Sequence, residues 1–163
     1  MRQIGNRTSN EVACENGLCR FLLISCSQRK RRDAGLLPAI DRYDGPAFQV
    51  LRRYLRTTRH PQLQVYVLSA EFGFISSQTP IPYYDRRMTV ERARELREKT
   101  TEMLESILAQ HQCMELFICA SNVYQEVVDQ SRLERFLRVR IAEKGQGPKL
   151  GSLHRWLRER SNG

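Results

Sequence analysis

The stretch RFLLISC at residues 20–26 is a short apolar run between polar segments, and it decides the fold class. A run of this length and composition is typical of a strand that is buried on both faces of a sheet. Two later runs share the pattern, QVYVLS at residues 64–69 and ELFICA at residues 115–120. Both are rich in residues that favour strands, so we expect three buried strands.

Helical patterns separate these three runs. Residues 45–59 have apolar side chains at helical spacing and arginines on the other faces, which predicts an amphipathic helix. Thr89 is a suitable cap for a long helix that ends near Gln110, and a final helix is expected over residues 150–160. Strands that alternate with helices predict an α/β fold with a small, mostly parallel sheet flanked by helices.

The remaining segments give weaker signals. Residues 71–88 contain Gly73, Pro80 and Pro82, which disfavour a helix or a central strand there. The other expectations are a short helix over 122–129, either helix or strand over 133–141, and a turn at 145–148.

The chain has 163 residues, enough for one domain with its own core. We expect a flexible N-terminal arm over residues 1–18 and a single α/β domain over 19–163. No apolar run approaches the roughly 20 residues that span a bilayer, and the polar N-terminus does not resemble a secretory signal.

Cysteine and histidine usage gives no sign of a metal site. The five cysteines are an odd number without paired short spacings, and the three histidines lie in unrelated contexts. We therefore expect free thiols, a cytoplasmic protein and no bound metal. The sequence indicates no particular cofactor.

The formal net charge is +9, from 27 basic and 18 acidic residues. This balance favours a polyanionic partner, either nucleic acid or a phosphorylated small molecule, although the same charges could simply form a solvated surface. The candidate nucleic-acid contacts are Arg29, Arg31, Arg32, Arg52, Arg53 and Arg56.

The three expected strands end in small polar or thiol residues, at 26–27, 69–70 and 120–122. If the strands are parallel, these ends meet at one edge of the sheet, where open α/β sheets bind ligands. The sequence therefore predicts a pocket there. The candidate ligand-binding residues are Ser27, Lys30, Tyr43, Ala70, Gly73, Tyr83, Tyr84, Arg86, Ser121 and Asn122.

A catalytic set is a second interpretation of this edge. Cys26 is followed by cations that favour its thiolate, although a structural cysteine is the commoner case. Asp85 could act as a general base or merely cap a helix, and Ser69 completes the set. Nearby, Gly73 permits a positive φ, and Tyr83 or Tyr84 could stack on a nucleobase.

Four segments together resemble known families: ISCSQRK at 24–30, YDG at 43–45, LSAEFGFI at 68–75 and IPYYDRRM at 81–88. They resemble a group of small bacterial and phage domains that start with Cys-Ser-x-x-Lys. More distantly they are similar to the YaaA family of peroxide-stress proteins, although Cys26 and Ser27 replace the Pro-Ala of that family. The YaaA resemblance implies DNA binding and a stress response. A weaker similarity to the lyase-like domain of archaeosine synthase implies base or tRNA modification.

Three functions stay open on these observations. The first is a nucleic-acid- or nucleotide-binding protein of YaaA-like type. The second is an enzyme acting on a nucleoside, base or nucleotide, by base modification or glycosidic-bond chemistry, with Cys26, Ser69 and Asp85. The third is a small accessory subunit of a larger complex, with Tyr54, Phe74 and Trp156 as partner contacts instead of core residues.

Overall fold

A computed structural model describes residues 19–59, 62–110, 113–134 and 138–159. The expected arm over residues 1–18 lies outside these ranges. Within them, no helix is both long enough and apolar enough to cross a membrane.

A five-stranded mixed sheet forms the centre of the molecule, in the order β4-β3-β1-β6-β7. The strand β1 is parallel to both neighbours, β7 is parallel to β6, and β4 is antiparallel to β3. The α/β fold and the three strands expected from the sequence are confirmed. The bounds are β1 Cys19–Ser25, β3 Leu63–Ser69, β4 Gly73–Ser76, β6 Cys113–Cys119 and β7 Arg138–Ile141.

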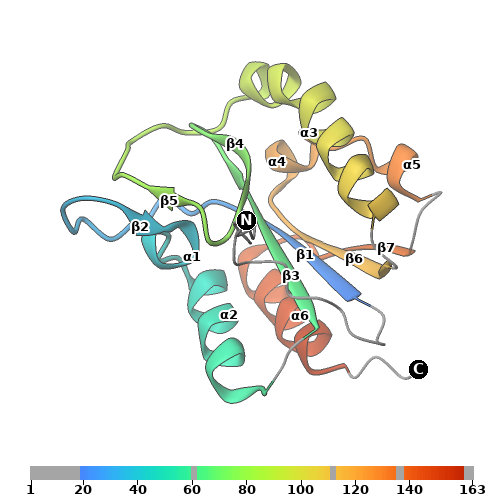
Figure 1. Ribbon diagram of the computed structural model, residues 1–163, viewed down its shortest axis with the longest axis horizontal. Helices are drawn as coiled ribbons and strands as arrows, with labels where there is room; N and C mark the ends of the chain where they lie inside the picture. The colour runs from blue at the N-terminus through green and yellow to red at the C-terminus, as the bar shows by residue number, and fades with distance from the viewer. Residues whose placement is uncertain (1–18, 60–61, 111–112, 135–137, 160–163) are drawn as a thin grey trace, which may run out of the picture.

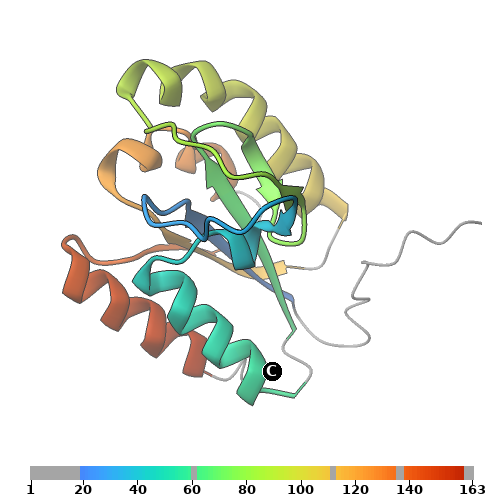
Figure 2. The same ribbon diagram turned by 90° about the vertical axis from the view of Figure 1, so that its left-hand side faces the viewer.

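Helices cover both faces of this sheet (Figures 1 and 2). One face carries α2 (Pro46–Thr57) and α6 (Gln146–Arg158), and the other carries α3 (Val90–Gln110), α4 (Asn122–Gln125) and α5 (Gln130–Leu133). Right-handed crossovers explain this division, because the chain leaves β1 toward one edge of the sheet and later crosses back toward the other.

The side chains of alternate residues in β1 pack into two separate hydrophobic cores. Leu22 and Ile24 join the cluster under α2 and α6, whereas Phe21 and Leu23 join the cluster under α3. The side chains proposed as partner contacts mostly belong to these cores. Trp156 and Phe74 are buried, and Tyr54 packs against the first cluster while half-buried, so Trp156 and Phe74 are core residues and not a docking surface.

The order of the parallel strands creates a switch point beside β1. The connection from β1 leads to β3 on one side, and the next parallel strand, β6, lies on the other side. Connections that diverge in this way leave a crevice between the carboxyl ends of β1 and β6.

A small two-stranded sheet, β2 (Leu37–Pro38) with β5 (Pro80–Ile81), lies above this edge, and α1 (Ala39–Arg42) follows β2. The fully buried Arg42 holds it in place, donating to the carbonyl oxygens of Arg31, Asp33, Gly35 and Ile81. Residues 71–88 contain the edge strand β4 and the short strand β5, and no helix or central strand, as expected.

Several boundaries differ from the sequence-based expectation. The last helix begins at Gln146, because Pro148 is tolerated in a first turn, where the main-chain N–H groups need no partner within the helix. The helix expected over 122–129 is shorter than predicted, because α4 ends at Gln125 and α5 begins only at Gln130, and the ambiguous 133–141 segment ends as β7. Thr89 caps α3 as expected, accepting from the Arg92 N–H at 3.1 Å.

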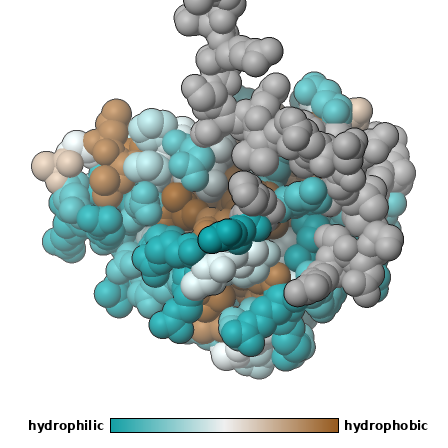
Figure 3. Space-filling view, turned by 60° about the horizontal axis from the view of Figure 1, so that its bottom comes forward, coloured by the Kyte–Doolittle hydropathy of each residue, from teal (hydrophilic) through white to brown (hydrophobic). Residues whose placement is uncertain are grey.

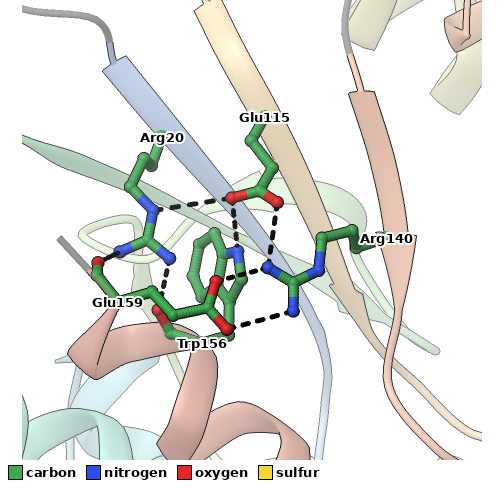
Figure 4. Close-up of polar contacts among 5 residues, drawn as sticks. All are labelled: Arg20, Glu115, Arg140, Trp156 and Glu159. Carbon is green, nitrogen blue, oxygen red and sulfur yellow. Dashed lines mark hydrogen bonds and ion pairs between the residues drawn. The ribbon is translucent and has the colours of Figure 1, made fainter. Parts of the chain in front are cut away.

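At the amino edge of the sheet a polar network fastens α6 to the strands (Figure 4). Glu115 accepts a 2.8 Å hydrogen bond from the Trp156 indole and pairs with Arg20 and Arg140 at 3.8 and 3.2 Å. The Arg20 guanidinium lies 3.8 Å from the Trp156 ring centroid, and Arg140 also pairs with Glu159. This network holds α6 against the sheet. It lies at the amino ends of the strands, and the switch point lies at their carboxyl ends.

The expectation of free thiols holds for only part of the set. Cys26 and Cys119 are free, whereas Cys19 is in a disulfide bond. The odd cysteine count without paired short spacings therefore did not exclude a disulfide bond at Cys19.

Candidate functional site

The three strand ends meet as expected. Cys26 follows β1, Ser69 ends β3, and Ser121 lies just after β6. The Cys26 N–H donates to the Leu68 carbonyl at 2.9 Å, which continues the pairing of β1 with β3 beyond the end of β1. Parallel pairing thus brings distant polar residues to one edge.

A cavity of about 500 Å³ opens at the switch point, between the ends of β1 and β6. We call it the switch-point cavity. Its volume lies in the range of small-molecule sites. Its walls are formed by Ile24, Ser25, Cys26, Ser27, Gln28, Arg29, Gly45, Pro46, Ala47, Phe48, Cys119, Ser121, Tyr124, Gln146, Lys149 and Leu150.

A close backbone approach forms one wall of this cavity. The Gly45 N–H donates to Ser27 Oγ at 3.1 Å, and that hydroxyl donates to the Arg29 carbonyl at 2.6 Å. A Cβ atom at Gly45 would lie only 2.6 Å from Ser27 Cβ. Glycine is therefore required where α2 begins against the end of β1.

Two helices begin at the cavity. Pro46 opens α2 and Gln146 opens α6, and no side chain caps either helix. The free N–H groups and the helix dipole make such N-termini electropositive. Lys149 adds positive charge, whereas Arg29 is paired with Asp44, and none of the lining residues is acidic. The cavity is therefore suited to an anion.

The Cys26 thiol lies 2.9 Å from the Tyr124 hydroxyl, and Cys26, which lines this cavity, is 8 % exposed. Burial, followed by the charge of Cys26, raises the pKa of the Tyr124 phenol, so the hydroxyl keeps its proton. Burial also raises the pKa of the Cys119 thiol to about 11, despite the nearby Lys149. Cys26 also has the larger exposed fraction of the two cavity cysteines.

Beside the cavity lies a tyrosine cluster, in which Tyr43 and Ser69 are buried and Tyr84 and Lys30 are half-buried. The hydroxyls of Tyr43 and Tyr84 are 2.7 Å apart, and Tyr84 contacts Ser69 Oγ at 3.0 Å. Lys30 Nζ lies 4.5 Å from the Tyr84 ring centroid. Burial raises the pKa of both phenols. Burial lowers the pKa of Lys30, and the charges of Cys26 and Asp85 oppose this lowering.

The three predicted catalytic residues lie at the same edge of the sheet, but they do not line the same cavity. Cys26 lines the cavity, whereas Ser69 is fully buried beneath Tyr84 and also accepts from the N–H groups of Glu71 and Phe72. Asp85 is exposed in the segment that follows Tyr84. Ser69 is covered because residues 82–88 fold over the end of β3.

Among the candidate ligand-binding residues outside the tyrosine cluster, some lie at the switch-point cavity and others lie away from it. Ser27 and Ser121 line the cavity, and Asn122 opens α4 beside it. Four others lie away from the cavity. The Ala70 carbonyl accepts a hydrogen bond from Arg92, and Gly73 has a φ of +72°. Arg86 forms an ion pair with Glu71, and the exposed Tyr83 ring lies under the Arg32 guanidinium.

Several of the candidate nucleic-acid contacts have internal partners. Arg29 and Arg52 both pair with Asp44, and Arg31 pairs with Asp33. Arg52 also donates to the carbonyls of Ile40 and Tyr43, so its guanidinium holds the turn before α2. Arg53 and Arg56, in contrast, are exposed on α2.

The remaining cavity residues were not recognisable from sequence patterns. Tyr124 carries no motif, and Lys149 directly follows a segment expected to be a simple turn. The spacing of Phe48 placed it on the apolar side of a helix, with no sign that it would reach a cavity. In the described part of the chain, no three histidine, cysteine or acidic residues are grouped to hold a metal ion.

Comparison with known proteins places the chain in a family. The model of a family of unknown function, DUF6884, matches residues 21–159. The chain belongs to this family. No curated protein matches it. The matched residues include those that line the switch-point cavity and form the tyrosine cluster, and the resemblance to the YaaA family stays a prediction.

Proposed function

We propose that this protein binds a phosphorylated small ligand of the nucleotide class in the switch-point cavity. The observation that carries the proposal is the position of the cavity, between the carboxyl ends of β1 and β6 and at the start of α2 and α6. Open α/β sheets bind ligands at such a switch point, and helix N-termini bind phosphate.

The walls match the two halves of a nucleotide. Lys149 and the first turns of α2 and α6 supply positive charge and free N–H groups for a phosphate. Phe48, Ile24 and Leu150 supply apolar surface for a base or sugar. A cavity with apolar walls and a few convergent polar groups is the usual form of a small-molecule site.

Calorimetric titration with the common nucleoside monophosphates tests this proposal. We expect at least one of them to bind, and Lys149→Ala to weaken it about tenfold, because a charge-assisted contact to phosphate is lost. Lys99→Ala is the matched control, since Lys99 is exposed on α3 across the sheet. If none binds, or if both variants bind as the unmodified chain does, the proposal is wrong.

A second candidate function is an enzyme of nucleosides or nucleotides with Cys26 as nucleophile. The observation that favours it is that Cys26 lines the cavity with its thiol 2.9 Å from a protonated Tyr124 hydroxyl. A hydroxyl in this position can donate to a thiolate, the reactive form of cysteine. Ser69 and Asp85 lie outside the cavity walls, so their part in this chemistry would be positioning through Tyr84 and Lys30.

Release of free base from nucleosides and nucleotides, followed by chromatography, tests this second function. We expect Cys26→Ala to abolish release, and Ser69→Ala and Asp85→Ala to reduce it. Turnover that survives in Cys26→Ala would remove the thiol from the mechanism, and an absence of turnover in the unmodified chain would leave binding as the function.

A further inference from the structure

A second hollow, of about 670 Å³, lies along the outer sides of α2 and α6. We call it the α2–α6 groove. Figure 3 turns the lower ends of these two helices toward the viewer and shows hydrophilic side chains around a smaller apolar area. The groove is lined by Pro46, Gln49, Val50, Arg52, Arg53, Tyr54, Arg56, Thr57, His154, Leu157 and Arg158.

The charge of this groove has one sign. Neither α2 nor α6 contains an aspartate or a glutamate. Arg53 and Arg56 lie one turn apart on α2, and Arg158 extends from α6. All three are exposed, and within the residues that the structure describes none of their guanidinium groups has an ion-pair partner. The groove is therefore complementary to an anion.

The distribution of the arginines indicates an extended anion. The twelve residues of α2 span about 18 Å, and its exposed cations lie in the half that is distant from the cavity. A single small anion could bridge Arg53 and Arg56, which lie one turn apart, but it would leave the rest of the groove, including Arg158 on α6, without a ligand. A chain with repeated charges can contact several, and guanidinium groups bind phosphates in bidentate fashion.

The groove and the switch-point cavity are adjacent. Pro46 lines both, since it opens α2 at the cavity and begins the groove along the same helix. A chain whose end lies in the cavity can thus continue along α2. Tyr54 also lines the groove, half-buried against the core, and aromatic side chains at such positions can stack on single-stranded bases.

From these observations we infer that the α2–α6 groove binds the backbone of a single-stranded nucleic acid whose terminal nucleotide occupies the switch-point cavity. This inference rests on the proposed nucleotide site and specifies its substrate class. Arg53, Arg56 and Arg158 contact the phosphates, while Arg52 stays paired with Asp44 and shapes the wall.

Fluorescence anisotropy with a short labelled oligothymidylate, together with calorimetry of thymidine monophosphate, tests the inference on the full chain. The test variant is Arg53→Gln with Arg56→Gln. The control is Arg94→Gln with Lys99→Gln, which removes the same charge from exposed positions of α3. Circular dichroism and thermal melting establish that each variant is folded.

We expect the test variant to bind the oligonucleotide about tenfold more weakly. The slope of log affinity against log salt should fall by about 1.4, since each phosphate contact on a single strand contributes about 0.7. The control should bind as the unmodified chain does, and thymidine monophosphate should bind equally to all three proteins.

Four outcomes would overturn the inference. Equal oligonucleotide binding by the test variant and the control removes the groove from recognition. Monophosphate binding that gains nothing from a longer strand leaves the nucleotide site standing without the groove. Competition by polyglutamate as effective as that by oligothymidylate assigns the groove to acidic peptides, and tighter binding of duplex than of single strands assigns it to duplex DNA. Oligonucleotide binding that depends on Arg53 and Arg56, without any monophosphate binding, would instead contradict the proposed cavity site and the placement of the terminal nucleotide there, and would leave the groove as the surface that binds the strand.

Discussion

The Sγ atom of Cys26 lies 2.9 Å from the hydroxyl oxygen of Tyr124, and both side chains line the switch-point cavity. Cys26 follows the central strand β1, and Tyr124 comes from α4, directly after β6. The contact therefore joins the two chain segments that border the crevice. A ligand in the cavity lies against both groups, which makes the thiol a reporter of occupancy.

Tyr43, which is buried, and Tyr84 and Tyr124, which are half-buried, should resist ionisation in the folded protein. Burial is the main cause that raises the pKa of Tyr43, Tyr84 and Tyr124 above the usual value of 10. Above pH 10 the folded state then holds protons that the unfolded state releases, so the free energy of unfolding falls as the pH rises further. Ultraviolet titration should show these phenols ionising only on unfolding. Reversible ionisation near pH 10 that is lost in Tyr84→Phe would contradict this.

Gly45→Ala should destabilise the protein by about 1–3 kcal/mol, because the added Cβ meets Ser27 Cβ at 2.6 Å. Gly147→Ala is the matched control, since a Cβ at Gly147 meets nothing within 4 Å and the residue lies in α6. That control should be neutral or stabilise by about 0.5–1 kcal/mol. Urea unfolding measures both values, and equal stability of the two variants would show that the approach of Gly45 to Ser27 is not constrained.

The sequence was most informative about the central strands. The runs at β1, β3 and β6 are continuous and apolar because both faces of each strand are buried, and this pattern is visible without the fold. The strands β4 and β7 have four residues each, with sequences GFIS and RVRI, and lie at the sheet edges. Such short segments carry no distinctive pattern, so their pairing depends on tertiary contacts.

The candidate site was predictable as an edge of the sheet but not as a cavity. Small residues at the strand ends indicated where Cys26, Ser27 and Ser121 would meet, and all three line the hollow. The opposite walls come from the first turns of α2 and α6, which depend on how the helices pack. Similarly, nothing local to Ser69 indicates that Tyr84 would cover it.

Arg42→Lys should destabilise the protein by about 3 kcal/mol, although it keeps the positive charge. A lysine cannot replace the planar guanidinium that donates to the carbonyls of Arg31, Asp33, Gly35 and Ile81. Arg94→Lys, at an exposed position of α3, should change stability by less than about 0.5 kcal/mol. Chemical denaturation compares them, and similar values would mean that Arg42 is not needed to fasten residues 31–35.

Glu115→Gln should loosen α6 from the sheet and cost about 3 kcal/mol, because Arg20 and Arg140 lose a partly buried counter-charge (Figure 4). Trp156 is the single tryptophan, so its fluorescence reports on this contact directly. Glu102→Gln, on the exposed side of α3, is the control. An unchanged emission maximum together with unchanged stability would show that the network contributes nothing to packing.

The rate at which iodoacetamide alkylates Cys26, followed by peptide mass spectrometry, tests the central claim most directly. Cys119 should stay unmodified near neutral pH, because it is 1 % exposed and burial raises its pKa to about 11. If a nucleotide binds in the switch-point cavity, a saturating nucleoside monophosphate should suppress alkylation of Cys26 in proportion to occupancy, and the nucleoside without phosphate should protect much less. Alkylation of Cys26 at the same rate with the bound nucleotide and without it would contradict the account.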